Sequence, residues 1–143
     1  MKFLLDTSVV SELVKPAPHA GVVSWLDQCD EDGLFLSVLT IGELEKGIAK
    51  LADPRRRARL TTWVRKDLAV RFGPRLLPVS LEVAARWGAL TGQSERTGQP
   101  LPVIDSLLAA TSLVHGLAVA SRNRADFDRC GVECFDPWTM ADG

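Results

Sequence analysis

Three acids stand at unexpected places in the sequence, and a fourth follows a predicted strand. Asp6 ends the apolar run KFLLD, and Asp105 interrupts the apolar stretch VIDSLLAA. Glu43 lies beside the apolar stripe of TIGELEKGIAKL, and Asp126 follows the run LAVA by a few residues. A buried, ionised carboxylate is unfavourable unless a cation or a helix N-terminus pairs with it. If the fold brings these acids together, a hard divalent cation such as Mg²⁺ or Mn²⁺ is the expected partner.

A carboxylate-bound metal suits the hydrolysis of phosphodiester bonds. Such an ion lowers the pKa of water and neutralises phosphate oxygens. Each acid also has a simpler structural explanation, because Asp6 or Asp105 could cap a helix. Glu43 could be a solvated helix residue, and Asp126 could be an acid of a surface loop. Spacing alone leaves both interpretations open for all four.

Short apolar runs alternate with segments of helical periodicity along the whole chain, which predicts an α/β fold with a parallel sheet. Ligands of such sheets bind outside the carboxyl ends of the strands. Asp6 and the residues after the strand LAVA should lie at that edge. The expected strands are 2–6, 34–37, 76–80, 117–121 and 132–138. The expected helices are 8–15, 18–33, 40–51, 53–72, 81–98 and 103–116.

The composition is that of an ordinary globular protein. The chain has 143 residues, of which 46% are hydrophobic and 24% charged, enough for one buried core. A net charge of −1 excludes a protein that binds nucleic acid through an overall positive field, so such binding would need a local patch. The segment RRRAR at 55–59 is either that patch or a solvated helix face. We find no internal repeat and no linker.

The cysteines, the histidines and the N-terminal segment indicate no zinc site, no catalytic histidine and no signal peptide. Cys130 and Cys134 are separated by three residues, which fits no usual zinc pattern, so reduced cysteines are expected. Neither His19 nor His115 falls at a predicted strand end. The start MKFLLDTSVV reaches an acid too early for a signal peptide, and no apolar run reaches the ~18 residues of a membrane span. These features predict a cytoplasmic protein.

The ordered motifs of the chain resemble the PIN domain family, and within it the VapC toxins of bacterial toxin–antitoxin systems. The matching pieces are FLLDTSVVSEL, LSVLTIGELEKGI, PVIDSLLAATSLVHGLAVASRNRADF and FDPW, in that order. The resemblance implies a single PIN domain over residues 1–143, with a central parallel sheet between helical layers. It also implies an Mg²⁺-dependent (or Mn²⁺-dependent) endoribonuclease, a hydrolase acting on RNA.

The resemblance also implies a set of site residues. The first three metal-binding and catalytic acids of the family fall on Asp6, Glu43 and Asp105. Asn123 stands where many members have a fourth acid, and Asp126 is the candidate to replace it. The number of metal ions is left open.

Four residues are expected to position substrate or water. They are Ser8, Ser121, Arg122 and Asn123. Ser8 is expected to orient a water molecule or Asp6, and Ser121 stands where threonine is frequent. Arg122 lies beside the proposed site and is expected to contact a phosphate or to pair with a catalytic acid.

The resemblance implies partners as well. A VapB-type antitoxin would cover the active-site groove of a toxin homodimer, in a larger hetero-oligomer and without a membrane. We hypothesise that four apolar residues line this groove, and the alternative is that they only pack in the core. These are Val9, Val10, Leu13 and Val14.

Two other functions compete with the nuclease. The absence of an acid at position 123 keeps open a PIN-fold module that binds nucleic acid or protein with little or no nuclease activity. A phosphohydrolase that forms an aspartyl phosphate at LDT is disfavoured, because such enzymes usually read D-x-D and Ser8 stands at the second acid. The sequence does not identify the RNA or the cleavage sequence.

Overall fold

The computed structural model describes residues 1–139, and its centre is a five-stranded parallel sheet in the order β3-β2-β1-β4-β5. The central strand β1 pairs with β2 on one side and β4 on the other, with Phe3 opposite Leu34 and Ala118. The predicted parallel sheet is therefore confirmed. The strands are β1 Phe3–Leu5, β2 Leu34–Ser37, β3 Leu76–Leu77, β4 Ala118–Ala120 and β5 Cys134–Phe135.

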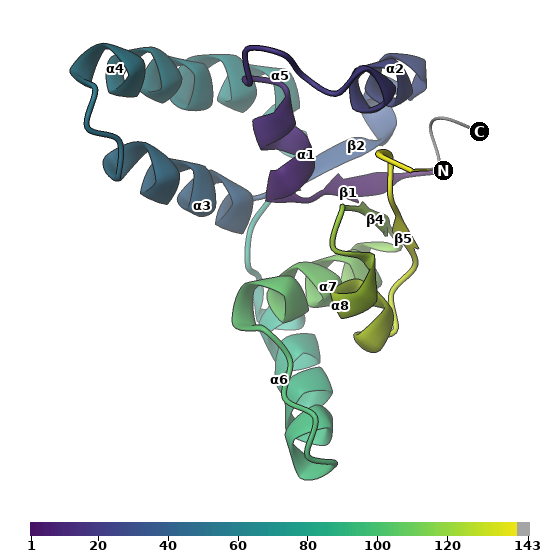
Figure 1. Cartoon of the computed structure of the whole chain (residues 1–143). Helices are drawn as coiled ribbons and strands as arrows, with labels where there is room; N and C mark the ends of the chain where they lie inside the picture. The colour runs from purple at the N-terminus through teal and green to yellow at the C-terminus, as the bar shows by residue number, and fades with distance from the viewer. Residues whose placement is uncertain (140–143) are drawn as a thin grey trace.

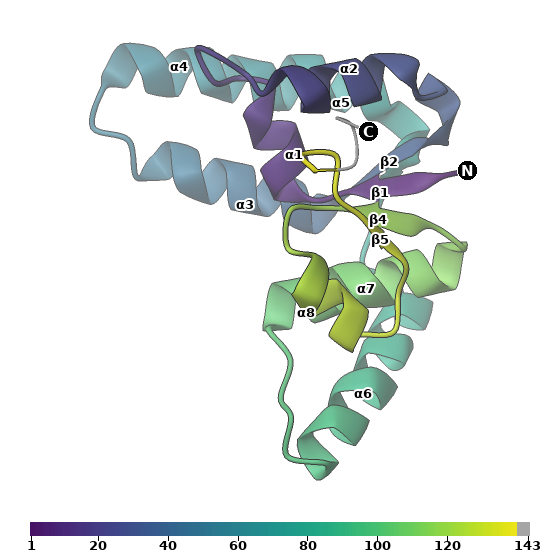
Figure 2. The same ribbon diagram turned by 45° about the vertical axis from the view of Figure 1, so that its right-hand side comes forward.

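Helices cover both faces of the sheet. Figures 1 and 2 show α1 to α5 on one side and α6, α7 and α8 on the other, with the ends of α4 and α6 reaching far from the sheet. This is the expected sandwich of a sheet between two helical layers. The helices are α1 Thr7–Glu12, α2 Ala20–Gln28, α3 Val38–Ala49, α4 Pro54–Thr62, α5 Ala69–Phe72, α6 Leu81–Arg96, α7 Val103–His115 and α8 Arg124–Arg129.

Side-chain caps and one glycine set several helix ends. The Asp53 and Ser80 side chains accept hydrogen bonds from backbone N–H groups at the starts of α4 and α6. The Ser37 hydroxyl does the same for α3, which places the first turn of that helix directly after β2. Helix α7 ends at Gly116, whose φ of 68° lies in the left-handed region that favours glycine.

Two apolar clusters form the core, one on each face of the sheet. Successive side chains of a strand point to opposite faces, so Phe3 and Leu5 join one cluster and Leu4 the other. Val9 and Val10 of α1 are 0% and 1% exposed within the first cluster. The hypothesis that these two valines line a groove is therefore wrong, because their side chains are buried in the core.

Several predicted elements have different bounds; the strand expected over 76–80, for example, is only Leu76–Leu77. The helix expected over 18–33 ends at Gln28, because Cys29 is extended and Asp30 then caps a separate 3₁₀ turn, Glu31–Gly33. The long helix over 53–72 contains a π-helical segment at Trp63–Leu68. The short strand and tail expected over 132–138 contain a strand of two residues, Cys134–Phe135. Helix α8 was not predicted, since the segment between the strands 117–121 and 132–138 was given no secondary structure.

No helix within residues 1–139 combines the length and the apolar character needed to cross a bilayer.

Candidate active site

The four acids come from four different elements at the carboxyl edge of the sheet. Asp6 directly follows β1, and Glu43 lies in α3, which directly follows β2. Asp105 is in the first turn of α7, and Asp126 is in the first turn of α8, after β4. Their charges act on one another, since Asp6, Asp126 and Glu43 all raise the pKa of Asp105. The fold thus gathers the four predicted acids, here called the acid cluster.

Asp6 is buried and held by two hydroxyl groups. Its Oδ2 accepts hydrogen bonds from Ser8 Oγ at 2.9 Å and from Ser121 Oγ at 2.7 Å. Although Asp6 occupies the N-cap position of α1, its side chain makes no capping hydrogen bond. The capping explanation therefore fails for Asp6. The structure places Ser8 and Ser121 against Asp6, where the resemblance implied positioning roles.

Glu43 is held by a residue that the sequence reasoning missed. Thr7 Oγ1 donates a hydrogen bond of 2.5 Å to Glu43 Oε1, and it lies 3.4 Å from Oγ1 of the buried Thr40. Glu43 is therefore not simply a solvated helix residue. Two signals in the sequence could have found these threonines. Thr7 directly follows Asp6, and Thr40 precedes Glu43 by three residues, which places both on one face of α3.

Asp105 is the acid whose protonation is most perturbed. Burial first, and then the negative charges around it, raise its pKa from 3.8 to about 6. A hydrogen bond with Asp126 also favours its protonated form. The N-cap residue of α7 is Pro102, so Asp105 does not cap the helix. Asp105 instead faces the other acids from the first helical turn.

Both candidates for the fourth acid position contact Asp105. Asn123 Nδ2 donates to Asp105 Oδ2 at 3.4 Å, and the Asn123 backbone N–H donates to Ser121 Oγ at 2.9 Å. Asp126 shares a hydrogen bond with Asp105 and forms an ion pair of 3.7 Å with Arg129. Asn123 therefore links Ser121, which holds Asp6, to Asp105.

Arg122 contacts an aromatic ring and, among the described residues, forms no ion pair with the acids that it was expected to meet. Its guanidinium stacks 4.5 Å from the ring centroid of Trp138, which is buried. Within residues 1–139 it forms no ion pair with a carboxylate, so the expected pairing with a catalytic acid is wrong. A role in phosphate contact stays a prediction. Trp138 was quoted in the motif FDPW but received no role in the sequence reasoning.

The oxygen donors of the acid cluster fit a hard divalent cation. Among the described residues, no three His, Cys, Asp or Glu side chains stand close enough to enclose an ion by themselves. The cluster nevertheless consists of carboxylates and hydroxyls, the ligands that Mg²⁺ and Mn²⁺ prefer. Burial, and then the charges of the other acids, raise the pKa of Asp105, and a bound cation would favour its ionised form. All three cysteines are free, as expected.

Two grooves leave the acid cluster on opposite sides of α3. The α1–α3 groove, of about 320 Å³, is lined by Thr7, Ser11, Val14, Lys15, Glu43, Leu44, Gly47, Ile48, Leu51, Arg56, Leu60 and Trp63. The α3–α7 groove, of about 470 Å³, is lined by Val38, Leu39, Gly42, Glu43, Lys46, Gly47, Lys50 and Ile104. Glu43 belongs to both. Of the four apolar residues expected to line a groove, Val14 does so here.

Comparisons with known proteins show the family and the fold of the chain. The family model described as PIN domain matches residues 3–132. A VapC ribonuclease, Y4jK, of Sinorhizobium fredii is 31% identical over 96% of this chain and 99% of its own. Toxin FitB of Neisseria gonorrhoeae is 33% identical, covering 94% and 97%. The crystal structure of FitAcB from Neisseria gonorrhoeae superposes with a TM-score of 0.90 at 33% identity, covering 96% and 99%.

Proposed function

The chain belongs to the PIN domain family, as a ribonuclease toxin of the VapC type, and we propose that its acid cluster is the Mg²⁺-dependent centre that hydrolyses RNA phosphodiester bonds. The observation that supports this proposal is geometric: the acids come from four elements at the carboxyl edge of the sheet, and Ser121 and Asn123 link Asp6 to Asp105 by hydrogen bonds. Mn²⁺ could replace Mg²⁺ because both accept the same oxygen ligands.

Three of the four acids would enter catalysis already oriented. Ser8 and Ser121 fix the Asp6 carboxylate, Thr7 fixes that of Glu43, and Asn123 donates to Asp105. Preorganised ligands lose little freedom when substrate binds, which lowers the barrier of the chemical step. Asp6, Glu43, Asp105 and Asp126 would hold the divalent ion, which supplies neutralisation of phosphate charge and acidification of water.

An antitoxin of the VapB type is the proposed protein partner, and the α1–α3 groove is its proposed seat. The groove has an apolar floor that includes Leu44, Ile48 and Trp63, while Lys15 and Arg56 add charge to its lining. An apolar floor suits an amphipathic segment of a partner. The toxin would form a homodimer within a toxin–antitoxin hetero-oligomer. It would act in the cytoplasm, where its RNA substrate is found.

The test is cleavage of total RNA by the purified protein with Mg²⁺, Mn²⁺ or EDTA. The wild type should cut only with metal, and Asp6→Asn and Asp105→Asn should each lose at least about 100-fold in rate, because each removes a charged ligand. Asp27→Asn is the matched control, since Asp27 is exposed on α2.

Circular dichroism should show the same fold for all four proteins. Cutting that survives EDTA, or that both active-site variants retain, would contradict the proposal. An absence of cutting by the wild type, with metal present and antitoxin removed, would favour the binding module that Asn123 leaves open.

A further inference from the structure

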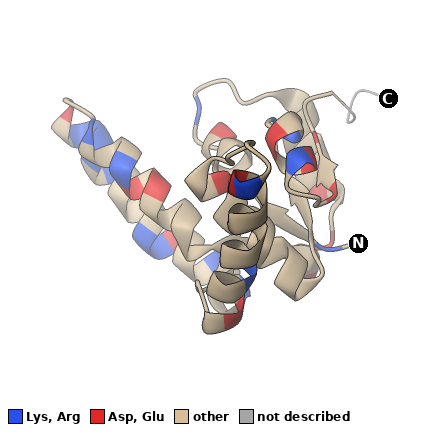
Figure 3. Ribbon diagram, turned by 90° about the horizontal axis from the view of Figure 1, so that it is seen from below, with Lys and Arg blue, Asp and Glu red and all other residues tan. Residues whose placement is uncertain are grey.

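Positive charge is concentrated on the hairpin formed by α3, α4 and the π-helical segment. Residues 43–67 contain eight Lys and Arg against four Asp and Glu, a net charge of +4 in a chain whose total is −1. Figure 3 shows these basic residues along the hairpin that projects at the left of the view. The rest of the molecule is therefore net acidic.

Most of these cations have no structural role within the described residues. Arg65 pairs with Glu45, and Arg57 donates to the Leu51 carbonyl. The other cations of α3 and α4 pair with no carboxylate among residues 1–139, and α4 buries none of its side chains. These are Lys46, Lys50, Arg55, Arg56 and Arg59. Their charges face solvent and are available to a partner.

Two of these cations extend the helix face that carries a catalytic acid. Glu43, Lys46 and Lys50 follow the spacing i, i+3, i+7, which aligns them on one side of α3. All three line the α3–α7 groove, together with Ile104, the residue before Asp105. The groove therefore begins at the acid cluster and continues past two ammonium groups about one helical turn apart. Val38 and Leu39 give it an apolar lining as well.

We propose that Lys46 and Lys50 bind consecutive backbone phosphates of RNA that extends from the cleavage site along the α3–α7 groove. This inference rests on the proposed function, because the strand must enter the acid cluster. Phosphate is the chemistry that unpaired lysines match, and the apolar lining offers contact to a base or ribose. The exposed arginines of α4 continue the positive surface beyond Lys50 and would receive more distant phosphates.

The test measures RNA binding without catalysis. A labelled single-stranded RNA of about 20 nucleotides is titrated in EDTA with wild type, with Lys46→Gln/Lys50→Gln, and with Arg86→Gln/Arg96→Gln. The control pair removes the same charge from exposed positions on α6, which Figure 1 shows projecting away from the hairpin. The lysine variant should bind about tenfold more weakly. Its slope of log affinity against log salt should fall by about 1.4, as expected for two lost phosphate contacts.

Equal weakening by the two double variants would overturn the inference, because it would show a general charge effect. Unchanged RNA binding by the lysine variant would also overturn it, and loss of antitoxin binding in that case would assign the surface to a protein. Cleavage of total RNA by the wild type tests the proposed function separately. If the wild type binds RNA but does not cleave it, the groove remains a nucleic-acid site, and only the proposed nuclease activity is contradicted.

Discussion

At the scale of single residues, neutral hydrogen-bond donors hold three of the four acids, whereas Asp126 pairs with Arg129. Thr7 of α1 holds Glu43 of α3, and Ser121 after β4 holds Asp6 after β1. A carboxylate fixed in this way keeps its orientation without a permanent positive partner, which would compete with a metal ion. The hydroxyl groups are therefore as important to the proposed chemistry as the acids.

Replacement of Thr7 by Val should lower the rate of RNA cleavage about tenfold, because Glu43 loses a charge-assisted hydrogen bond while the side-chain volume is kept. Thr7→Ser should restore most of the rate, since it returns the hydroxyl. Cleavage rates at saturating metal check this. Equal losses in Thr7→Val and Thr7→Ser would indicate a packing effect instead of an orienting hydrogen bond.

The raised pKa of Asp105 predicts that the metal-free protein becomes less stable as pH rises. The folded protein holds this proton up to a pKa of about 6, whereas the ordinary value is 3.8, so stability is lost as pH rises through that interval. Between about pH 5 and pH 7 in EDTA, the free energy of unfolding should fall by about 1 kcal/mol after solvent screening. Glu12 and Glu31, whose pKa values are lowered, act in the opposite sense and mainly below this range.

Urea unfolding at the two pH values measures this change, and Asp105→Asn is the control that should show a flat profile. If the variant keeps the same pH dependence as the wild type, the titrating group lies elsewhere.

The residues that the sequence identified are those whose type conflicts with their surroundings. Asp6 and Asp105 stand out because a carboxylate in an apolar run needs a reason. Thr7 and Thr40 were missed because a threonine near a helix start has many ordinary explanations. Arg122 was misjudged because no sequence pattern indicated that Trp138, sixteen residues later, would bind its guanidinium face.

At the scale of elements, prediction succeeded where pattern and cap agreed. Ser80 and Gly116 delimit helices of strong periodicity, and both ends were predicted. Helix α8 has six residues, and its N-cap Asn123 makes no capping hydrogen bond because the side chain reaches Asp105 instead. A helix defined by such a tertiary contact carries little local signal. The same holds for the π-helical segment Trp63–Leu68, which a periodicity of 3.6 does not reveal.

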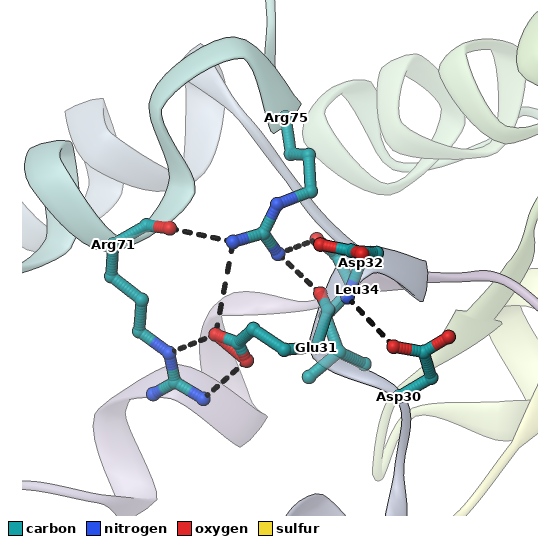
Figure 4. A network of polar contacts seen from close by, with 6 residues as sticks. All are labelled: Asp30, Glu31, Asp32, Leu34, Arg71 and Arg75. Carbon is teal, nitrogen blue, oxygen red and sulfur yellow. Dashed lines mark hydrogen bonds and ion pairs between the residues drawn. The ribbon is translucent and has the colours of Figure 1, made fainter.

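Arg75 connects the end of the α4–α5 layer to the start of β2. Figure 4 shows its guanidinium between Glu31 and Arg71. It donates to the carbonyl oxygens of Glu31 at 2.5 Å, Leu34 at 2.6 Å and Arg71 at 2.6 Å. It also lies 5.1 Å from the ring centroid of the buried Phe72. One side chain thus satisfies three carbonyl groups where two elements meet.

Arg75→Ala should lower the free energy of unfolding by about 2–4 kcal/mol, because three carbonyl groups lose a charged donor. Arg71→Ala is the comparison. Arg71 pairs with Glu31 at 2.6 Å, but its side chain is 39% exposed, so its loss should cost about 1 kcal/mol or less. Urea unfolding of both variants decides this, and similar losses would show that the network acts through its ion pair.

At the scale of the whole molecule, the acid cluster joins the two layers that the sheet separates. Glu43 belongs to the layer of α1 to α5, whereas Asp105 and Asp126 belong to the layer of α6 to α8. Asp6 lies between them at the central strand. Repulsion among these acids acts across the layers, so an ion bound at the cluster would stabilise the fold as a unit.

Saturating Mn²⁺ or Mg²⁺ should therefore raise the Tm of the wild type, a readout independent of catalysis. An ion at 100 times its Kd adds about 2.7 kcal/mol, which corresponds to roughly 5–10 °C for a chain of this size. Asp6→Asn should lose most of this shift, while Asp27→Asn should keep it. An increase in Tm that is equal in all three proteins would place the ion outside the acid cluster. No increase in the wild type would contradict a metal site at the cluster, because a ligand that binds only the folded state must stabilise it.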